Sequence, residues 1–302
     1  MTLIDTYRGY VSLAECDEMG HMNIQHYVGK ASDAHFNLRA ALGLGYEHQA
    51  REHTTYVALE HHIRFHRELR ASDLVLIRSG IVEVREKTMR VYQEAREILD
   101  DRLAATLVLD VGHFDLDKRK LTPWPAHVRK KAKALMAELP DHAAARSLPA
   151  DTLTRDISLA RADELGMLET NRSAVAPWEC DSNGHMNTRF FMARVSDAQG
   201  HMWAHAGLGR HEQAARGLAT ATVETRLAYR RELMAGQTIV VRTSIEADSA
   251  RTLRYRHWLF NGETGEPAFE AVGCGLLFDK STRKAVTLPD DVKARLAEKN
   301  GN

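Results

Sequence analysis

The chain has 302 residues, enough for two domains of ordinary size, and its formal net charge at pH 7 is zero. Zero net charge argues against a dedicated surface for nucleic acid or an anionic membrane, and we find neither a secretory signal nor the ~18 apolar residues of a spanning helix. The three cysteines have no close partner in sequence, so we expect neither a disulfide framework nor a zinc site, and a reduced, cytoplasmic protein.

The first hundred residues predict one long helix and several strands. Apolar and β-branched residues favour a first strand over 7–15, followed by a glycine-containing loop at 17–23. Over 24–42 apolar residues recur at three- and four-residue spacing, which predicts a helix with Asn23 as its N-cap and Gly43 at its end. Alternation and β-branched runs then predict four strands, over 57–65, 74–84, 88–97 and 104–114. A helix followed by antiparallel strands indicates an α+β fold, a sheet wrapped on one helix.

This pattern occurs twice. Residues 15–23 read ECDEMGHMN and residues 179–187 read ECDSNGHMN, so that Asp181 follows Asp17 by 164 residues. The same offset relates Glu60 to Glu224 and the triplet Arg-Glu-Leu at 67–69 to that at 231–233, without a gap. A repeat of more than 100 residues is too long for a solenoid unit and indicates a duplicated domain.

A break separates the two copies. Pro123-Trp124-Pro125 ends the first pattern, a helix is predicted from His127 to Leu139, and a Pro/Ala-rich stretch follows over 140–150. The end of the chain repeats the order of proline and then helix, over 289–298. We therefore predict domains 1–145 and 146–302, each with a trailing helix.

The repeated loop resembles a known signature. Asp-x-x-Gly-His-Met-Asn at the start of a helix is similar to the motif of hotdog thioesterases of the 4-hydroxybenzoyl-CoA thioesterase-like group. The resemblance implies two tandem hotdog domains paired as a pseudo-dimer. It also implies that Asp17 and Asp181 act as nucleophile or general base on a thioester, and that backbone N–H groups at Asn23, Ile24, Asn187 and Thr188 bind the substrate carbonyl.

The second copy also resembles tandem-hotdog acyl-ACP thioesterases. Its Asp181, Asn183 and His185 match their Asp-x-Asn-x-His element, whereas Met19 replaces the asparagine in the first copy. Ala228 stands where those enzymes carry a glutamate, which argues against their complete mechanism. Asp181 is therefore the better candidate for an intact site, with Asn183 as a water-positioning amide or an ordinary turn residue.

The other candidates have two interpretations each. His21 and His185 either hydrogen-bond the water or leaving group, or tether the loop to a neighbouring strand. Glu60 and Glu224 either bind substrate in a cleft or are solvated strand carboxylates. His61, His62 and His66 suggest a metal, but adjacent strand residues face opposite sides and cannot converge, so we expect no metal. We expect no cofactor.

We thus predict an acyl-CoA thioesterase, and the sequence does not identify its acyl group. Acyl carrier protein is a further possible carrier of that group, and the double unit is expected to form a homo-oligomer or to act alone. Trp178, Trp203 and Trp258 are expected in the core, with an acyl pocket or a cage for a cation as the alternative. Two other functions remain open: an enoyl-CoA hydratase-like hotdog enzyme, and a non-catalytic acyl-CoA-binding protein.

Overall fold

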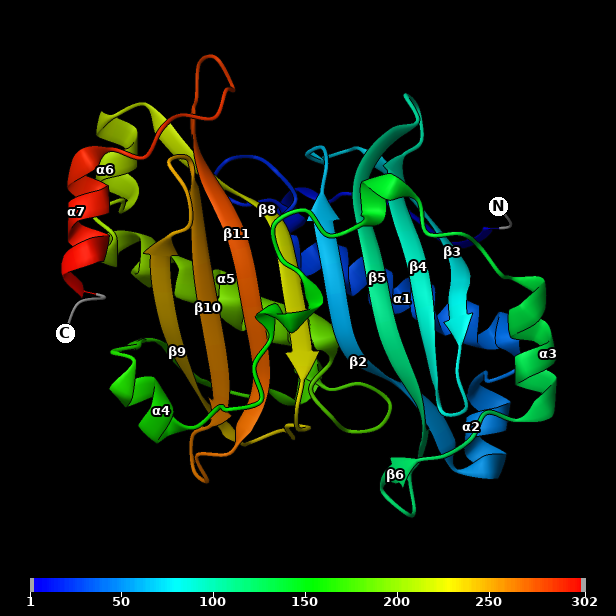
Figure 1. Cartoon of the computed structure of the whole chain (residues 1–302). Helices are drawn as coiled ribbons and strands as arrows, with labels where there is room; N and C mark the ends of the chain where they lie inside the picture. The colour runs from blue at the N-terminus through cyan, green and yellow to red at the C-terminus, as the bar shows by residue number, and fades with distance from the viewer. Residues whose placement is uncertain (1–2, 300–302) are drawn as a thin grey trace. The chain divides into compact units, whose positions relative to one another are not determined.

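A computed structural model describes residues 3–299, which form two compact units (Figure 1). The first unit ends at Ala144 and the second begins at Ala145. No helix in residues 3–299 has both the length and the apolar character that crossing a membrane requires. We describe each unit by itself.

The first unit is a five-stranded antiparallel sheet with one long helix. Its strands are paired in the order β1-β3-β4-β5-β2, and the short strand β6 pairs with β5. A 3-10 turn at Leu13–Glu15 follows β1. In chain order the elements are β1 (Ile4–Tyr10), α1 (Ile24–Leu42), α2 (Tyr46–Glu52), β2 (Thr54–Phe65), β3 (Leu74–Val84), β4 (Thr88–Glu97), β5 (Arg102–Asp115), β6 (Lys120–Leu121) and α3 (Ala126–Ala134).

The second unit repeats this arrangement, with strands paired in the order β8-β11-β10-β9-β7. A 3-10 turn at Pro177–Glu179 takes the place of the first. The elements are α4 (Leu159–Glu164), β7 (Leu168–Ala174), α5 (Thr188–His205), α6 (Arg210–Ala215), β8 (Leu218–Tyr229), β9 (Thr238–Ala247), β10 (Thr252–Asn261), β11 (Pro267–Asp279) and α7 (Asp290–Lys299).

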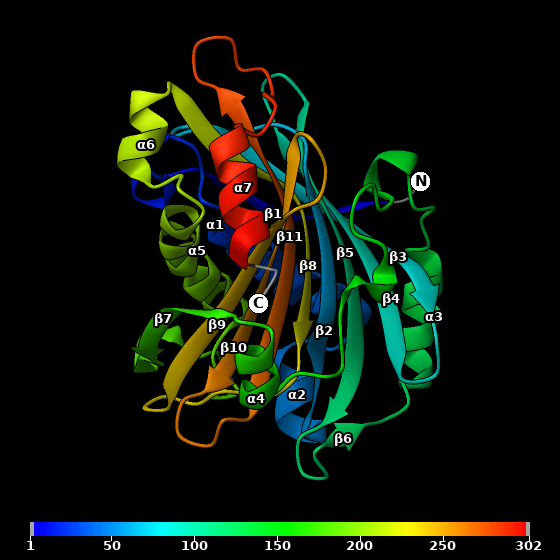
Figure 2. The ribbon, with the colours of Figure 1, turned by 60° about the vertical axis from the view of Figure 1, so that its left-hand side comes forward.

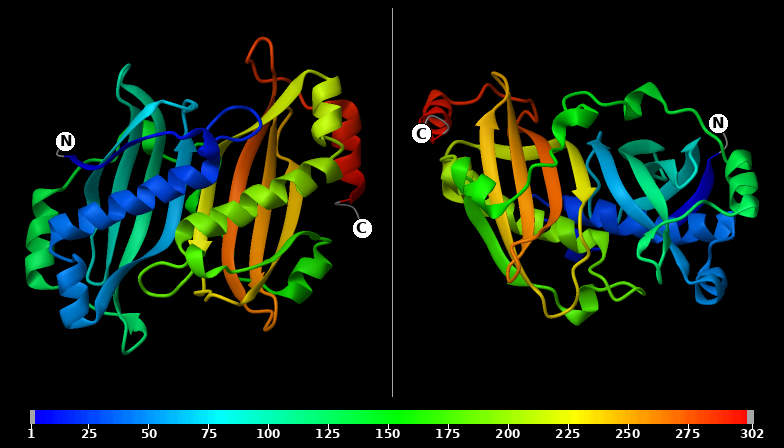
Figure 3. Two further views of the ribbon diagram at one scale, coloured as in Figure 1. Left: turned by 180° about the vertical axis from the view of Figure 1, so that it is seen from behind. Right: turned by 60° about the horizontal axis from the view of Figure 1, so that its bottom comes forward.

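Each core lies between the long helix and its own sheet. In Figure 3 the view from behind shows α1 and α5 each crossing one face of its strands. Tyr27 on α1 packs edge-on against Phe65 of β2, with ring centroids 5.2 Å apart. Phe191, the equivalent residue of α5, lies 5.2 Å from Phe269 of β11. Burying aromatic rings of this size stabilises the packing of each helix on its sheet.

Most of the predicted elements are confirmed. Both long helices begin after their asparagine N-caps, and Gly43 ends α1 in the left-handed conformation (φ 84°) that favours glycine. The strands β3 and β4 have the predicted bounds. Trp203 and Trp258 are buried as predicted, but Trp178 is 80% exposed on its 3-10 turn, so its expected place in the core is wrong.

The predicted C-terminal ends of one strand and one helix are wrong, each for an identifiable reason. The first strand ends at Tyr10 because the Glu15 carboxylate accepts the N–H of Ser12 (2.8 Å), which closes residues 13–15 into a turn. The helix expected to reach Leu139 ends at Ala134, since the next residues pair with β3: Ile81 donates to the carbonyl of Leu135 and accepts from Ala137. The short helices α2, α4 and α6 were not predicted.

Side chains on the outer face of the second sheet hold the segment that precedes α4. Glu224 is 1% exposed and accepts backbone N–H groups from Arg146, Ser147 and Leu148 at 2.7–3.3 Å. Glu270 is fully buried and accepts the N–H of Thr154. At the far end of this unit α6 and α7 lie side by side (Figure 2), where Arg216 donates two hydrogen bonds to Asp291.

A buried ion pair connects each 3-10 turn to the long helix that follows it. Lys30 of α1 donates to Glu15 at 2.8 Å and to the carbonyl of Tyr10 at 3.0 Å. At the same places in the second unit, Arg194 donates to Glu179 (2.7 Å) and to the carbonyl of Ala174 (2.9 Å). The pair therefore clamps the strand end, the turn and the helix together just before the repeated loop.

We predict that Lys30→Met and Arg194→Met both lower the free energy of unfolding, measured by urea denaturation. Removing one partner of a buried pair leaves the other charge uncompensated, at a cost of about 3–5 kcal/mol when both are buried. Arg194 and Glu179 meet this condition, whereas the Glu15 side chain is 21% exposed, so we expect about 1–3 kcal/mol for Lys30→Met. Arg8→Met and Arg172→Met, which break exposed pairs, are the controls, and equal losses there would contradict the prediction.

Candidate active site

The repeated loop is a short hairpin that ends at the start of the long helix. The N–H of Asp17 donates to the carbonyl of His21 (2.8 Å), Cys16 pairs with Met22, and the N–H of Asn23 donates to the carbonyl of Glu15 (2.9 Å). The second loop has the same bonds, at 2.8 Å from Asp181 to His185 and 2.9 Å from Asn187 to Glu179. The tip of each hairpin needs a left-handed residue, which Gly20 (φ 75°) and Gly184 (φ 78°) supply. The hairpin thus presents its aspartate beside the helix start.

The two aspartates are held differently. In both loops Oδ1 accepts two backbone N–H groups, from Met19 (2.9 Å) and His21 (3.3 Å) on Asp17 and from Asn183 (2.8 Å) and His185 (3.3 Å) on Asp181. The side-chain amide of Asn183 also donates to Oδ2 of Asp181 at 3.3 Å. Within residues 3–299 no group donates a hydrogen bond to Oδ2 of Asp17, and the side chain of Met19, which stands in the place of Asn183, has no donor.

The environment of Asp17 also disfavours its charged form. Partial burial raises the pKa of Asp17 above its ordinary value, and the hydrogen bonds from Met19 and His21 only partly offset that effect. A carboxylate with one unengaged oxygen and a raised pKa is a stronger base than an ordinary surface aspartate. Asp17 thus has the features of a reactive group, although its loop lacks the asparagine.

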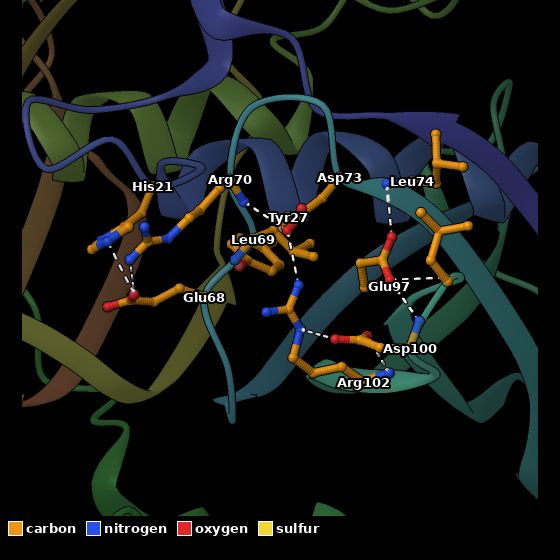
Figure 4. A network of polar contacts seen from close by, with 11 residues as sticks. His21, Tyr27, Glu68, Leu69, Arg70, Asp73, Leu74, Glu97, Asp100 and Arg102 are labelled. Carbon is orange, nitrogen blue, oxygen red and sulfur yellow. Dashed lines mark hydrogen bonds and ion pairs between the residues drawn. The ribbon is translucent and has the colours of Figure 1, made fainter.

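Each loop histidine contacts a glutamate from the turn that follows β2 in the first unit, as Figure 4 shows, and β8 in the second. His21 Nε2 lies 3.0 Å from Oε2 of Glu68, and His185 Nδ1 lies 3.3 Å from Oε1 of Glu232. The backbone of each histidine also bridges to that turn, at Arg70 and Met234. The histidines therefore tether the loop, as one of the two interpretations predicted, and do so through an ionisable partner.

The helix starts correct the expectation for the two asparagines. Their side chains cap α1 and α5 by accepting the N–H of Gln25 (3.1 Å) and Arg189 (3.0 Å), and their own N–H groups are bonded within the hairpin. Asn23 and Asn187 are thus structural. The N–H groups of Ile24 and Thr188, by contrast, have no acceptor in the described part of the chain, as is usual for the first residue of a helix.

The strand glutamates do not join this loop. Glu60 and Glu224 lie on strands β2 and β8 at positions that face away from the long helix, and Glu224 is already bonded to residues 146–148. We therefore correct the expectation that Glu224 binds substrate, since its carboxylate holds the connecting segment. Glu60 is half-buried.

No group of three or more His, Cys, Asp or Glu residues in the described chain is arranged to hold a metal ion. Sequence reasoning missed the ion-pair partners of each loop and the glutamates that contact the histidines. Glu15, Glu68 and their repeats are identical in the two copies, and position 30 keeps a positive charge as Arg194. Identity at polar positions between the copies is the signal that points to them.

Comparison with known proteins identifies the family and the fold. Residues 11–132 and 175–296 both match the sequence profile of the thioesterase-like superfamily. Over 100 residues, 33% of this chain, the sequence is 29% identical to betainyl-CoA thioesterase of Pseudomonas aeruginosa, and the match spans 63% of that relative.

Solved structures resemble the whole chain. A putative oleoyl thioesterase from Lactobacillus plantarum superposes with a TM-score of 0.71 at 16% identity, covering 96% of this chain and 98% of that one. The 12:0-ACP thioesterase from Umbellularia californica gives 0.67 at 14% identity, covering 91% and 94%. At such low identity these likenesses show the fold, and they confirm the predicted tandem hotdog domains. The chain belongs to the thioesterase-like superfamily.

Proposed function

We propose that the protein hydrolyses an acyl-coenzyme A thioester to the free acid and coenzyme A. The observation that carries this proposal is the repeated placement of a hairpin aspartate beside a helix whose first N–H has no acceptor in the described chain. Thioester hydrolysis needs a nucleophile or base and a donor for the developing oxyanion. Asp17 or Asp181 supplies the first, and the N–H of Ile24 or Thr188 the second.

The chemistry follows from these two groups. The carboxylate either attacks the carbonyl carbon itself or removes a proton from the water that does so. As the tetrahedral species forms, charge moves onto the carbonyl oxygen, and the helix N-terminus with its open N–H stabilises it. The C–S bond then breaks, and the sulfur leaves with the electron pair and takes up a proton. In the direct-attack route the acyl group is now held on the aspartate as an anhydride, and a water molecule cleaves it to release the free acid and restore the carboxylate. Asn23 and Asn187 contribute by fixing where the helix starts.

Coenzyme A is proposed as the carrier because the curated relative similar over 100 residues is named for a CoA thioester. Ala228 also occupies the place of the glutamate expected of acyl-ACP thioesterases, which argues against that mechanism. An assay with acyl-ACP beside acyl-CoA distinguishes the two carriers.

We predict that Asp17→Asn and Asp181→Asn together abolish hydrolysis, measured as thiol release from a panel of short, medium and betainyl acyl-CoAs. The double variant should lose at least about 10³-fold in kcat/KM, since it retains the oxyanion donors but has no carboxylate. The single variants report which loop is active. Full hydrolysis in the double variant would contradict the mechanism, whereas binding without turnover in the parent would favour a non-catalytic acyl-CoA-binding protein, and hydration of enoyl-CoA a hydratase.

Asp17→Asn should not destabilise the protein at neutral pH. A carboxyl whose pKa is raised on folding binds its proton more tightly in the folded state, so ionising it reduces stability as the pH rises through that pKa. Asparagine keeps the acceptor for the Met19 and His21 N–H groups without that charge. The Tm of the variant should match the parent below about pH 4 and equal or exceed it at pH 7. The exposed Asp117→Asn serves as the control, and a lower Tm for Asp17→Asn at pH 7 would be evidence against this account.

Proline at the first helical position tests the oxyanion donor. Proline is tolerated there and removes only the N–H, and the backbone of Asn23 (ψ 144°) and Asn187 (ψ 147°) already suits a following proline. Ile24→Pro and Thr188→Pro should lower kcat by about 10²–10³-fold in an active loop. Ile24→Ala and Thr188→Ala keep the N–H and are the matched controls. Equal kcat in the proline and alanine variants would rule out this donor.

A further inference from the structure

Residues 126–139, which comprise α3 and the segment after it, carry a concentration of positive charge. They contain four Lys or Arg side chains and a single carboxylate. Arg129, Lys130 and Lys133 are exposed, and none of the three forms an ion pair within residues 3–299. The fourth cation, Lys131, lies against the glycine that ends α1. The formal net charge of zero is the balance of the whole chain and therefore conceals this cluster.

The geometry of α3 directs three of the cations away from the fold. Val128 and Ala132, one turn apart, are fully buried and hold the helix beside β3 and the end of α1 (Figure 1). At about 100° per residue, Arg129, Lys130 and Lys133 project from the other side of the helix. The three cations thus form one outward-facing basic surface.

The second unit shows that the fold does not require these charges. Its equivalent helix, α7, keeps the buried apolar stripe through Val292 and Leu296, which are 1% and 2% exposed. The charges of α7 are mixed, because it begins with Asp290 and Asp291, and both aspartates are in ion pairs. The cations of α3 are therefore not needed to hold such a helix on its sheet, and another role must explain their concentration.

Exposed apolar side chains adjoin the basic surface. Met136 and Leu139 follow α3 and are 43% and 37% exposed. The backbone fixes the place of Met136, because Ile81 of β3 donates to the carbonyl of Leu135 and accepts from Ala137 on either side of it. Cations beside exposed apolar groups are typical of segments that lie on an anionic bilayer, where the cations attract headgroups and the apolar groups enter the boundary below them.

The composition of this segment favours a lipid surface over a nucleic acid. Proteins that bind nucleic acids read bases with amide groups or stack them on aromatic rings. Residues 126–139 contain no Asn, Gln, Phe, Tyr or Trp. The exposed methionine and leucine, in contrast, have a counterpart in the acyl region of a bilayer and none in a phosphate backbone.

We propose that Arg129, Lys130 and Lys133, with Met136 and Leu139, form a docking surface for an anionic lipid bilayer, called the α3 surface below. The guanidinium and ammonium groups contact the phosphate-bearing headgroups, and the two apolar side chains enter the boundary between headgroups and acyl chains. Binding of this kind is peripheral and reversible. It goes beyond the proposed function, because it requires no thioester.

Co-sedimentation of the full chain with lipid vesicles tests the α3 surface. The chain should bind vesicles of phosphatidylcholine mixed with phosphatidylglycerol but not those of phosphatidylcholine alone, and binding should weaken as the ionic strength rises. Each cation near the bilayer contributes about fivefold. Arg129→Gln with Lys130→Gln and Lys133→Gln should therefore lower the partition coefficient about 100-fold. The matched control makes the same change of net charge at exposed lysines elsewhere and should bind as the parent does: Lys87→Gln, Lys280→Gln and Lys284→Gln.

A second variant tests the apolar part of the surface. Met136→Gln with Leu139→Gln should lower the partition coefficient about 10-fold, because the polar amides do not enter the bilayer boundary. Leu99→Gln with Leu165→Gln, at exposed leucines elsewhere in the chain, is the control. All of these positions are at least partly exposed, so Tm should stay at the parent value. Unchanged binding without the apolar pair would contradict the α3 surface as proposed.

The remaining outcomes are distinct. Failure to bind the anionic vesicles would overturn the proposal, and so would an equal loss in the basic variant and its lysine control, since binding would then depend on net charge alone. Stronger binding to single-stranded RNA or to acyl carrier protein than to the vesicles, lost in the same variant, would also overturn it. Thiol release is measured in parallel: vesicle binding by a chain that hydrolyses no thioester would refute the proposed function and leave the α3 surface standing.

Discussion

The site depends on one buried interaction, the ion pair between the 3-10 turn and the long helix. Burying a charge is costly unless it is paired, and here each carboxylate also accepts the N–H that closes its own turn, from Ser12 and from Ala176. For Glu15 burial opposes ionisation, but the bonds from Lys30 and Ser12 outweigh it and lower its pKa. The carboxylate is therefore charged at neutral pH and joins three chain segments, so the next two residues along the chain place the aspartate at a fixed point beside the helix start.

Part of this arrangement was readable in the sequence and part was not. The duplication, the motif and the N-cap depend on local patterns: Asn23 caps α1 as predicted, and its repeat Asn187 caps α5. The burial of Lys30 could not be predicted because a charged residue in a helix pattern is ordinarily solvated, and only the fold of the turn over it leaves the side chain 7% exposed. The role of Glu224 could not be predicted for a related reason, because the backbone N–H groups that its carboxylate accepts lie 76–78 residues earlier in the chain. Contacts between residues far apart in the chain leave no periodic pattern in the sequence, so sequence reasoning does not find them.

The two loops show that symmetry of fold does not extend to symmetry of chemistry. The Asn183 side chain donates to the second carboxylate oxygen of Asp181, whereas the Met19 side chain has no donor for the corresponding oxygen of Asp17. Arg70 lies by Glu68, and Met234 replaces it beside Glu232. Each substitution changes a charge or a donor within contact of the loop while the backbone bonds stay the same. The sequence motif favoured Asp181 as the intact site, whereas Asp17 combines an unengaged oxygen with a pKa that partial burial raises above the ordinary value of an aspartate.

The helix N-terminus explains why this loop suits acyl transfer without further machinery. A capping asparagine satisfies the N–H of the second helical residue, and the hairpin takes the N–H of the cap itself, which leaves the N–H of the first helical residue open. The open N–H points along the helix axis, at the positive end of the helix dipole, which attracts negative charge. This end of the helix stabilises a neutral thioester carbonyl only slightly, but it stabilises a developing oxyanion much more. In the proposed mechanism, the same caps that stabilise the fold leave a donor open that stabilises the transition state more than the ground state.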